Sequence, residues 1–278
     1  PTRPVRMLCG FIVTGANDPL QRRIAQHLTE ALGQTFLIET RAGGGGNIAM
    51  DALAKSAPDG HTLLFGPIGP VITNPIMMGA RLPYNAETDF TPIMRVSELP
   101  FTVVVHQSVP SDPAGFIAWL RENPEMLFSS PGVGSTGHLL GAQLSNLLGL
   151  RLQHVAYSTL AQADLIEGRL KMALLTSSTV PPLVADGRVR AVLSTSAERE
   201  PQQPAVPTFA EAGFPQMTYN SWWALFGPRG LPPEIEARLR SLVSAFQAQP
   251  EIDAWMRSVG LAPVPGDAEH GAFARFLD

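Results

Sequence analysis

The chain has 278 residues with a formal net charge of −4, and it contains one cysteine. This length allows roughly two domains of ordinary size, each with its own core. The small negative charge argues against nucleic acid or an anionic membrane surface as a partner. No apolar run approaches the roughly 18 residues needed to cross a bilayer, so direct membrane insertion is not expected. Cys9 has no second cysteine to pair with, and its apolar neighbours indicate a small buried side chain.

Strand and helix patterns alternate along the chain, which predicts an α/β fold with mainly parallel sheets. The first apolar run, over residues 7–13, predicts a buried strand. Asn17 is expected to cap a helix whose apolar residues recur at helical spacing until Gly33 ends it. A second strand begins at Phe36.

The same order of strand, small-residue loop and helix returns about 120 residues later, which is too irregular for a repeat array. Residues 126–130 predict a strand, 131–137 a loop and 140–148 a helix, before a further strand over 150–157. Two lobes that each offer the N-terminus of a helix explain this recurrence.

Other elements follow from shorter patterns. Residues 48–57 and 233–246 predict helices, and residues 62–65 predict a buried strand. The runs at 101–105 and 222–226 are rich in β-branched or aromatic residues, and we expect them to be strands that cross between the lobes.

The loops at 14–18 and 132–138 carry the main functional signal. Small residues let the backbone approach a ligand closely, and the free N–H groups of a helix's first turn carry partial positive charge. Together these features predict an anion site that needs no lysine or arginine. Two ordinary strand-to-helix turns have the same composition, so both interpretations stay open at this point.

Four consecutive glycines occupy residues 43–46. No Gly-Lys-Ser/Thr follows them, and their spacing does not match GxGxxG, so neither a Walker-type loop nor a dinucleotide fingerprint is present. A flexible surface loop and a packing turn both fit.

Ser135 and His138 raise the possibility of nucleophilic catalysis. A nucleophile elbow needs glycine two residues before the serine, where this chain has Val133. We therefore interpret His138 as a residue of the first helical turn that orients the loop. The spacing of the six histidines does not predict a metal site. Trp222 and Trp223 are expected to include at least one core residue.

Several short motifs occur in order along the chain. They are 15–18 with Arg22, 39–47 (ETRAGGGGN), 58–64 (PDGHTLL), Asn74-Pro75, 82–84 (LPY) with Asp89-Phe90, 132–139 (GVGSTGHL), 154–157 (HVAY), 187–191 (GRVRA) and 206–213 (VPTFAEAG). In this order they resemble the Bug-type (TctC-like) periplasmic solute-binding receptors of the tripartite tricarboxylate transporter family. The resemblance runs from residue 7 to the C-terminus.

The resemblance implies an α/β, two-lobed periplasmic-binding-protein fold of the Venus-flytrap, type II-like kind, with two crossing strands. Lobe 1 would be 1–102 plus 223–278, and lobe 2 would be 103–222. Loops of both lobes would hold a ligand carboxylate through backbone N–H groups and water. The expected ligand-binding residues are Thr14, Gly15, Ala16, Asn17, Asp18, Gly66, Pro67, Gly69, Gly134, Ser135, Thr136, His138, Thr159, Thr176 and Ser177.

Some positions depart from the family's pattern. The first loop has Thr14, Ala16 and Asn17 where glycines are usual, and Thr159 stands where glycine is usual. Lys171 replaces an acidic residue that is common in the second lobe, and it is a candidate partner for a second carboxylate, although a surface lysine fits equally. These changes predict an atypical ligand.

The resemblance implies a monomeric periplasmic receptor that presents a small mono- or dicarboxylate to membrane transporter subunits. It implies no cofactor, no metal and no chemistry on the ligand. The chain begins at Pro1 with no leader-like segment, so we expect that a leader was removed or that the chain was trimmed. A ligand-sensing domain that feeds a signalling partner, and a serine hydrolase using Ser135, are the alternatives.

Overall fold

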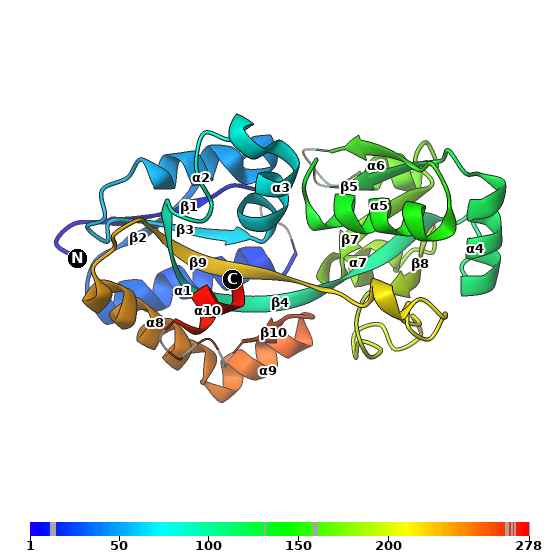
Figure 1. Cartoon of the computed structure of the whole chain (residues 1–278). Coiled ribbons are helices and arrows are strands. Elements are labelled where there is room, and N and C mark those ends of the chain that lie inside the picture. Colours follow the sequence, from blue (N-terminus) through cyan, green and yellow to red (C-terminus); the bar gives the residue numbers. More distant parts are fainter. Residues whose placement is uncertain are drawn as a thin grey trace. The chain divides into compact units, whose positions relative to one another are not determined.

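The computed structural model describes residues 1–11, 15–130, 132–157, 161–264, 267, 269 and 271–277. The chain divides into two compact units, shown with their elements in Figure 1. Unit 1 comprises Pro1–Glu98 with Trp222–Asp278, and unit 2 is Leu99–Ser221.

Two long strands carry the chain from one unit to the other. β4 (Phe90–His106) leads into unit 2, and β9 (Asn220–Pro228) leads back to unit 1. The two crossing strands predicted from the sequence are therefore present, and both are longer than expected. The expected lobe boundaries after residues 102 and 222 lie within these same strands.

β1 (Val5–Cys9) is the second strand of the sheet of unit 1. β2 (Phe36–Thr40) and β3 (Thr62–Pro67) flank it, both parallel to it. β9 pairs with β3 antiparallel, and β10 (Ala262–Pro263) pairs with β4 antiparallel. Met7, Leu8 and Cys9 of β1 are fully buried, as expected for a strand covered on both faces.

Helices α1 and α8 are the longest of unit 1. The helices of this unit are α1 (Asn17–Leu32), α2 (Asn47–Ala54), α3 (Asn74–Met78), α8 (Pro233–Gln247), α9 (Pro250–Ser258) and α10 (Ala272–Leu277). Its short turns are 3₁₀ at Gly44–Gly46 and Gly79–Arg81 and π at Gly69–Thr73. α2 ends at Ala54, three residues earlier than predicted.

α1 illustrates how the sequence specifies a helix. Leu20, Ile24 and Leu28 form its buried stripe. Gly33 ends it in the left-handed conformation at φ 68°, and its N–H donates to Thr29 O. The prediction that Asn17 caps the helix is wrong, because Ala16 occupies the cap position without a side-chain hydrogen bond and Asn17 is the first helical residue.

In the sheet of unit 2, β5 (Leu127–Ser130) lies between β6 (Gln153–Ala156) and β7 (Met172–Thr176), parallel to both. β7 and β8 (Val189–Ser194) pair antiparallel with β4. The helices of this unit are α4 (Pro113–Glu122), α5 (Thr136–Leu148), α6 (Gln162–Ile166) and α7 (Val180–Val184), and its 3₁₀ turns are Ser177–Thr179 and Pro215–Met217.

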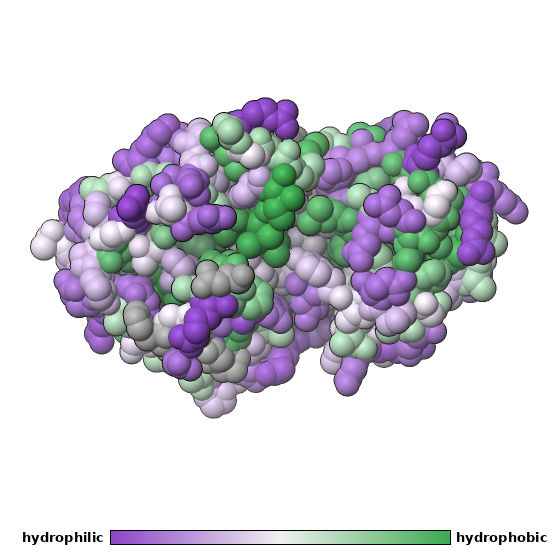
Figure 2. Space-filling model, viewed as in Figure 1, coloured by the Kyte–Doolittle hydropathy of each residue, from purple (hydrophilic) through white to green (hydrophobic). Residues whose placement is uncertain are grey.

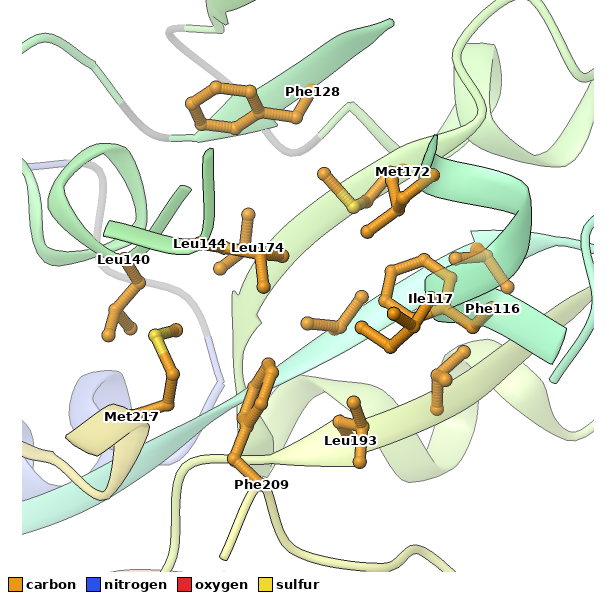
Figure 3. Packing of buried hydrophobic residues seen from close by; sticks show 14 of the residues in the cluster. Phe116, Ile117, Phe128, Leu140, Leu144, Met172, Leu174, Leu193, Phe209 and Met217 are labelled. Carbon is orange, nitrogen blue, oxygen red and sulfur yellow. The ribbon is translucent and has the colours of Figure 1, made fainter. Parts of the chain in front are cut away.

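The core of unit 2 forms where α4 and α5 pack on this sheet (Figure 3). Leu140 and Leu144 of α5 belong to the same buried cluster as Phe128 of β5 and Leu174 of β7. A Cβ built on Gly141 would lie 2.1 Å from Phe128 Cε2, so α5 approaches the sheet this closely only because residue 141 is glycine.

The expectation of mainly parallel sheets is correct for the first strands of each unit and wrong for the rest. β1, β2 and β3 are parallel, as are β5, β6 and β7. The crossing strands β4 and β9 instead join these groups antiparallel. The reason is connectivity, because a strand that enters a unit from outside is not obliged to follow a right-handed βαβ crossover.

Candidate functional site

In unit 1 the predicted binding residues gather at one edge of the sheet. β1, β2 and β3 are parallel, so the loops that follow them lie at their shared carboxyl edge, where α/β sheets commonly bind ligands. Residues 15–18 follow β1, the glycine turn 43–46 follows β2, and Gly66 to Gly69 complete and follow β3. Thr14 lies outside the described residues.

The glycine turn 43–46 packs between the other two loops. A Cβ on Gly46 would lie 2.6 Å from Pro70 Cγ and 2.8 Å from Phe11 Cε2. A Cβ on Gly10 would lie 2.8 Å from the Cα of Gly46. Of the two interpretations left open by the sequence, the packing turn is therefore correct for Gly46, which is also buried.

A buried polar network fixes the loop after β3, and it joins residues of three motifs to which the sequence analysis assigned no role. Asn74 Nδ2 donates to Asn47 Oδ1 (2.6 Å) and to Gly45 O (3.1 Å). Tyr84 Oη lies 2.7 Å from Asn47 Oδ1 and 2.8 Å from Pro70 O, two acceptors for its one proton. Burial raises the pKa of Tyr84, so the phenol stays protonated. The network ties the second and third loops together.

The N-terminus of α1 carries a negative charge of its own. Asp18 lies in its first turn and pairs with Arg22 at 3.0 Å. Asn17 is 2% exposed and accepts a hydrogen bond from Ser97 Oγ (3.3 Å), so its side chain anchors the loop to β4. An acidic side chain stabilises a helix N-terminus but opposes a second anion there.

In unit 2 the predicted residues also lie at a carboxyl edge. β5 leads into Gly134, Ser135 and the start of α5, and the parallel β7 leads into Thr176 and Ser177.

Lys171 lies at the opposite end of β7, and its Nζ is 3.2 Å from Ser108 Oγ. It borders a pocket of about 470 Å³ that Trp119 and Met126 also line. Of the two interpretations of Lys171 that the sequence left open, this position, away from the other predicted residues of unit 2, favours the surface lysine. Thr159 falls outside the described residues.

The loop before α5 is held by its own side chains. Ser135 is the N-cap, and its Oγ accepts from the backbone N–H of His138 (3.4 Å). Gly134 N–H donates to His138 Nδ1 (3.2 Å), and burial lowers the pKa of His138. The ring is therefore neutral with its proton on Nε2. This geometry confirms the prediction that His138 orients the loop.

Two residues behind this loop were not predicted. Ser130 Oγ lies 2.9 Å from Ser135 Oγ and 2.7 Å from His154 Nε2. The His154 ring lies 4.2 Å from that of His138, centroid to centroid. Burial, and secondarily the neighbouring His138, lowers the pKa of His154 to about 4. The adjacency of β5 and β6 brings Ser130 and His154 together, and strand pairing is what the sequence pattern does not show.

Thr176 and Ser177 differ in their surroundings. Ser177 is 1% exposed, and its Oγ lies 2.7 Å from Thr102 Oγ1. Gln203 donates to Ser177 O (3.3 Å), and Ser194 Oγ donates to the buried Glu200 (2.7 Å). Burial raises the pKa of Glu200. The Ser177 hydroxyl thus belongs to an internal network, whereas Thr176 is half-buried.

Exposed apolar side chains occur at both carboxyl edges. In unit 1 they are Ile48, which follows the glycine turn, and Ile76 and Met77 of α3. In unit 2, Val133 and Leu139 flank the start of α5, with 55% and 38% of their surface exposed. Figure 2 shows apolar residues reaching the surface in both units, within a largely polar exterior. Donor groups beside apolar side chains suit an organic anion.

Both tryptophans that the sequence analysis considered lie in the core. Trp222 and Trp223 are both buried, Trp222 against Phe273 and Trp223 against Phe65. Across the part of the chain that the structure describes, no group of three or more His, Cys, Asp or Glu could hold a metal ion. No helix in that part is long and apolar enough to cross a membrane.

The chain is similar to known receptors along nearly its whole length. The family model TctC, "Tripartite tricarboxylate transporter family receptor", matches residues 20–277. Protein BugT of Bordetella pertussis is 31% identical over 95% of this chain and 82% of its own length. The structure titled "R. palustris Rpa4515 with adipate" is 33% identical with a TM-score of 0.91, covering 100% of this chain and 93% of that one. MatC (Rpa3494) from Rhodopseudomonas palustris with bound malate is 29% identical with a TM-score of 0.90, covering 100% and 96%. The two-unit fold is thus that of a periplasmic binding protein, and the chain belongs to the TctC/Bug family of tripartite tricarboxylate transporter receptors.

Proposed function

We propose that this chain is a periplasmic receptor that binds a small organic carboxylate. It delivers the ligand to the membrane subunits of a tripartite tricarboxylate-type transporter, acts as a monomer and performs no chemistry on the ligand. The observation that carries the proposal is the likeness to two solved structures, one with adipate and one with bound malate, each covering the whole of this chain.

The start of α5 supports an anion site in unit 2. α5 has 13 residues, no acidic residue in its first turn and a serine cap. Its first-turn N–H groups have no acceptor within the helix and carry partial positive charge. Ser135 and the protonated Nε2 of His138 add side-chain donors at the same end. Charge-assisted hydrogen bonds from such donors offset the desolvation of a carboxylate.

The apolar side chains at the same edges support an organic ligand. Val133 and Leu139 lie next to the donors of α5, and Ile48 and Ile76 lie at the carboxyl edge of unit 1. A hydrocarbon chain gains free energy from such neighbours, whereas sulfate or phosphate does not. We therefore infer a carboxylate with an alkyl or aryl body.

The geometry around Ser135 favours binding over hydrolysis. His154 contacts Ser130 rather than Ser135, and the Ser135 hydroxyl already serves as the helix cap. A nucleophile needs its base within hydrogen-bond reach. In the hydrolase alternative, Ser135→Ala abolishes turnover of esters. If the chain is a receptor, neither the unsubstituted chain nor Ser135→Ala hydrolyses esters.

A ligand screen tests the proposal. The protein is unfolded, dialysed and refolded to remove carried-over ligand, and its Tm is measured with straight-chain mono- and dicarboxylates, malate and benzoate. A ligand that binds only the folded state stabilises it by RT ln(1 + [L]/Kd), so Tm rises with the logarithm of the ligand concentration once that concentration exceeds Kd. Adipamide is the matched control for adipate, since it keeps the shape and lacks the charge. Stabilisation by no acid, or equal stabilisation by acid and amide, contradicts carboxylate binding. Uptake assays in a strain lacking the receptor test delivery.

A further inference from the structure

A chain of hydrogen bonds runs from the loop before α5 into the sheet of unit 2. Ser135 Oγ, Ser130 Oγ and His154 Nε2 are linked at 2.9 Å and 2.7 Å. Ser130 also contacts both polar groups of Gly132, donating to its O at 3.1 Å and accepting from its N–H at 3.4 Å. Ser130 ends β5, and His154 lies in the neighbouring β6, opposite Phe128. Both residues are therefore fixed by the sheet, whereas Ser135 belongs to the loop.

Counting protons gives these bonds a direction. Ser130 has one hydroxyl proton. The carbonyl of Gly132 can only accept, so in the contact at 3.1 Å that proton comes from Ser130. With the proton there, His154 Nε2 supplies the proton of the 2.7 Å contact, and Ser135 donates to Ser130 as long as no ligand is bound. Were Nε2 unprotonated, Ser130 would have to donate to it even with a ligand present, and Ser135 could keep its contact with Ser130 only by donating inward.

We propose that His154 is a positioning residue that, by donating from Nε2 to Ser130, allows the hydroxyl of Ser135 to point its proton at a bound carboxylate. The inference rests on the proposed function, and it deepens it by naming a donor and the residue that orients it. When the ligand arrives, the Ser130 hydroxyl rotates from Gly132 O to Ser135 Oγ, and the Ser135 proton turns to the ligand. No covalent bond changes.

The surroundings of His154 suit a neutral ring held in one tautomer. Its ring packs against Phe128, 5.2 Å away, and His138, 4.2 Å away, measured between centroids. His138 has its own proton on Nε2, because Nδ1 accepts from Gly134. The two histidines thus have different roles. His138 holds the loop backbone, and His154 orients the hydroxyl of Ser130 and, through it, that of Ser135.

A matched pair of substitutions tests the direction of the bonds. Glutamine and methionine have similar length and shape, but only glutamine can donate. We expect His154→Gln to bind adipate within about threefold of the unsubstituted chain, and His154→Met to bind about tenfold more weakly, the loss of one charge-assisted hydrogen bond. Calorimetric titration gives both affinities. Equal affinities for the two variants overturn the proposal.

A double-mutant cycle separates positioning from packing. If His154 acts through Ser135, His154→Met on a Ser135→Ala background weakens binding no further. If the two losses multiply instead, His154 affects the site by packing alone and the proposal is wrong.

The tautomer can be measured without any ligand. Long-range ¹H–¹⁵N spectra of the refolded chain are expected to show His154 protonated at Nε2, and protonation at Nδ1 overturns the proposal. This measurement also separates the proposed function from the positioning role of His154. A chain that binds no carboxylate contradicts the proposed function. The tautomer, measured without ligand, decides whether His154 donates to Ser130.

Discussion

Among single residues, the neutral His154 has a consequence for stability that needs no ligand. Its pKa is about 4 in the folded chain, against 6.5 for an unperturbed histidine. Between these values the unfolded chain binds a proton that the folded chain does not. The free energy of unfolding therefore falls as pH falls from 6.5 towards 4, by about 1–3 kcal/mol in total for a half-buried ring.

Chemical denaturation at a series of pH values checks this expectation. His154→Gln is the control, because the difference between the two stability curves isolates one group. The subtraction is needed because burial raises the pKa of Glu200. The contribution of Glu200 to the free energy of unfolding therefore falls as pH rises, opposite to that of His154. A difference curve that is flat from pH 6.5 to 4 would show that His154 is not desolvated as described.

Tyr84 gives a second prediction for a single residue. Tyr84→Phe leaves Asn47 and Pro70 without the buried hydroxyl that both contact, and we expect a loss of about 1–3 kcal/mol in the free energy of unfolding. Tyr157→Phe is the matched control, because its hydroxyl meets Asp164 at a more exposed position, and it should cost less than about 1 kcal/mol. Urea denaturation measures both, and equal losses would contradict the role given to the network.

For the elements, the packing of α5 on β5 gives a prediction that opposes helix propensity. Alanine is favoured over glycine in a helix by about 1 kcal/mol. At Gly141, however, the added Cβ meets the Phe128 ring, and we expect Gly141→Ala to destabilise unit 2 by about 1–3 kcal/mol. Asn146→Ala places alanine at an exposed position of the same helix, and we expect it to leave the free energy of unfolding unchanged or slightly higher. Thermal unfolding of both variants provides the measurement, and a stabilised Gly141→Ala would refute the close approach.

The helices and strands also show how much of the fold could be predicted from the sequence. Periodicity located α1, α5 and α8, and glycines marked the ends of α1 and α5, but the cap of α1 was wrong and α5 begins at Thr136, inside the predicted loop. Small residues after strands marked the loops at the carboxyl edges. The pairing of the strands could not be predicted, because nothing in the local sequence of β4 or β9 shows that they pair antiparallel with strands distant in the chain. For the same reason His154 and Ser130 were missed, since their contact depends on β5 lying beside β6. The role of Lys171 stayed open because a position along the chain does not reveal at which end of a strand it lies.

For the whole molecule, the two units differ in continuity. Unit 2 is one segment, Leu99–Ser221, whereas unit 1 needs two. Within unit 1, His27 of α1 contacts Leu242 O at 3.1 Å and packs against Phe246, both in α8. We therefore expect the fragment 99–221 to fold cooperatively, and the fragment 1–98 to stay unfolded for want of α8 and α9.

Circular dichroism and amide spectra of the fragments test this difference. The control joins residues 1–98 to 222–278 through a short glycine linker, which should restore a folded unit 1. A folded 1–98, or an unfolded linked chain, would contradict the division.

The split of unit 1 also sets an order in time. Any process that handles the chain from its N-terminus, such as synthesis or passage through a translocation pore, releases the first 98 residues long before their partners from residue 222 onward. Unit 2 is then the first part able to complete its core, although it is the second to appear. The opening third of the chain cannot complete its core until the final helices arrive.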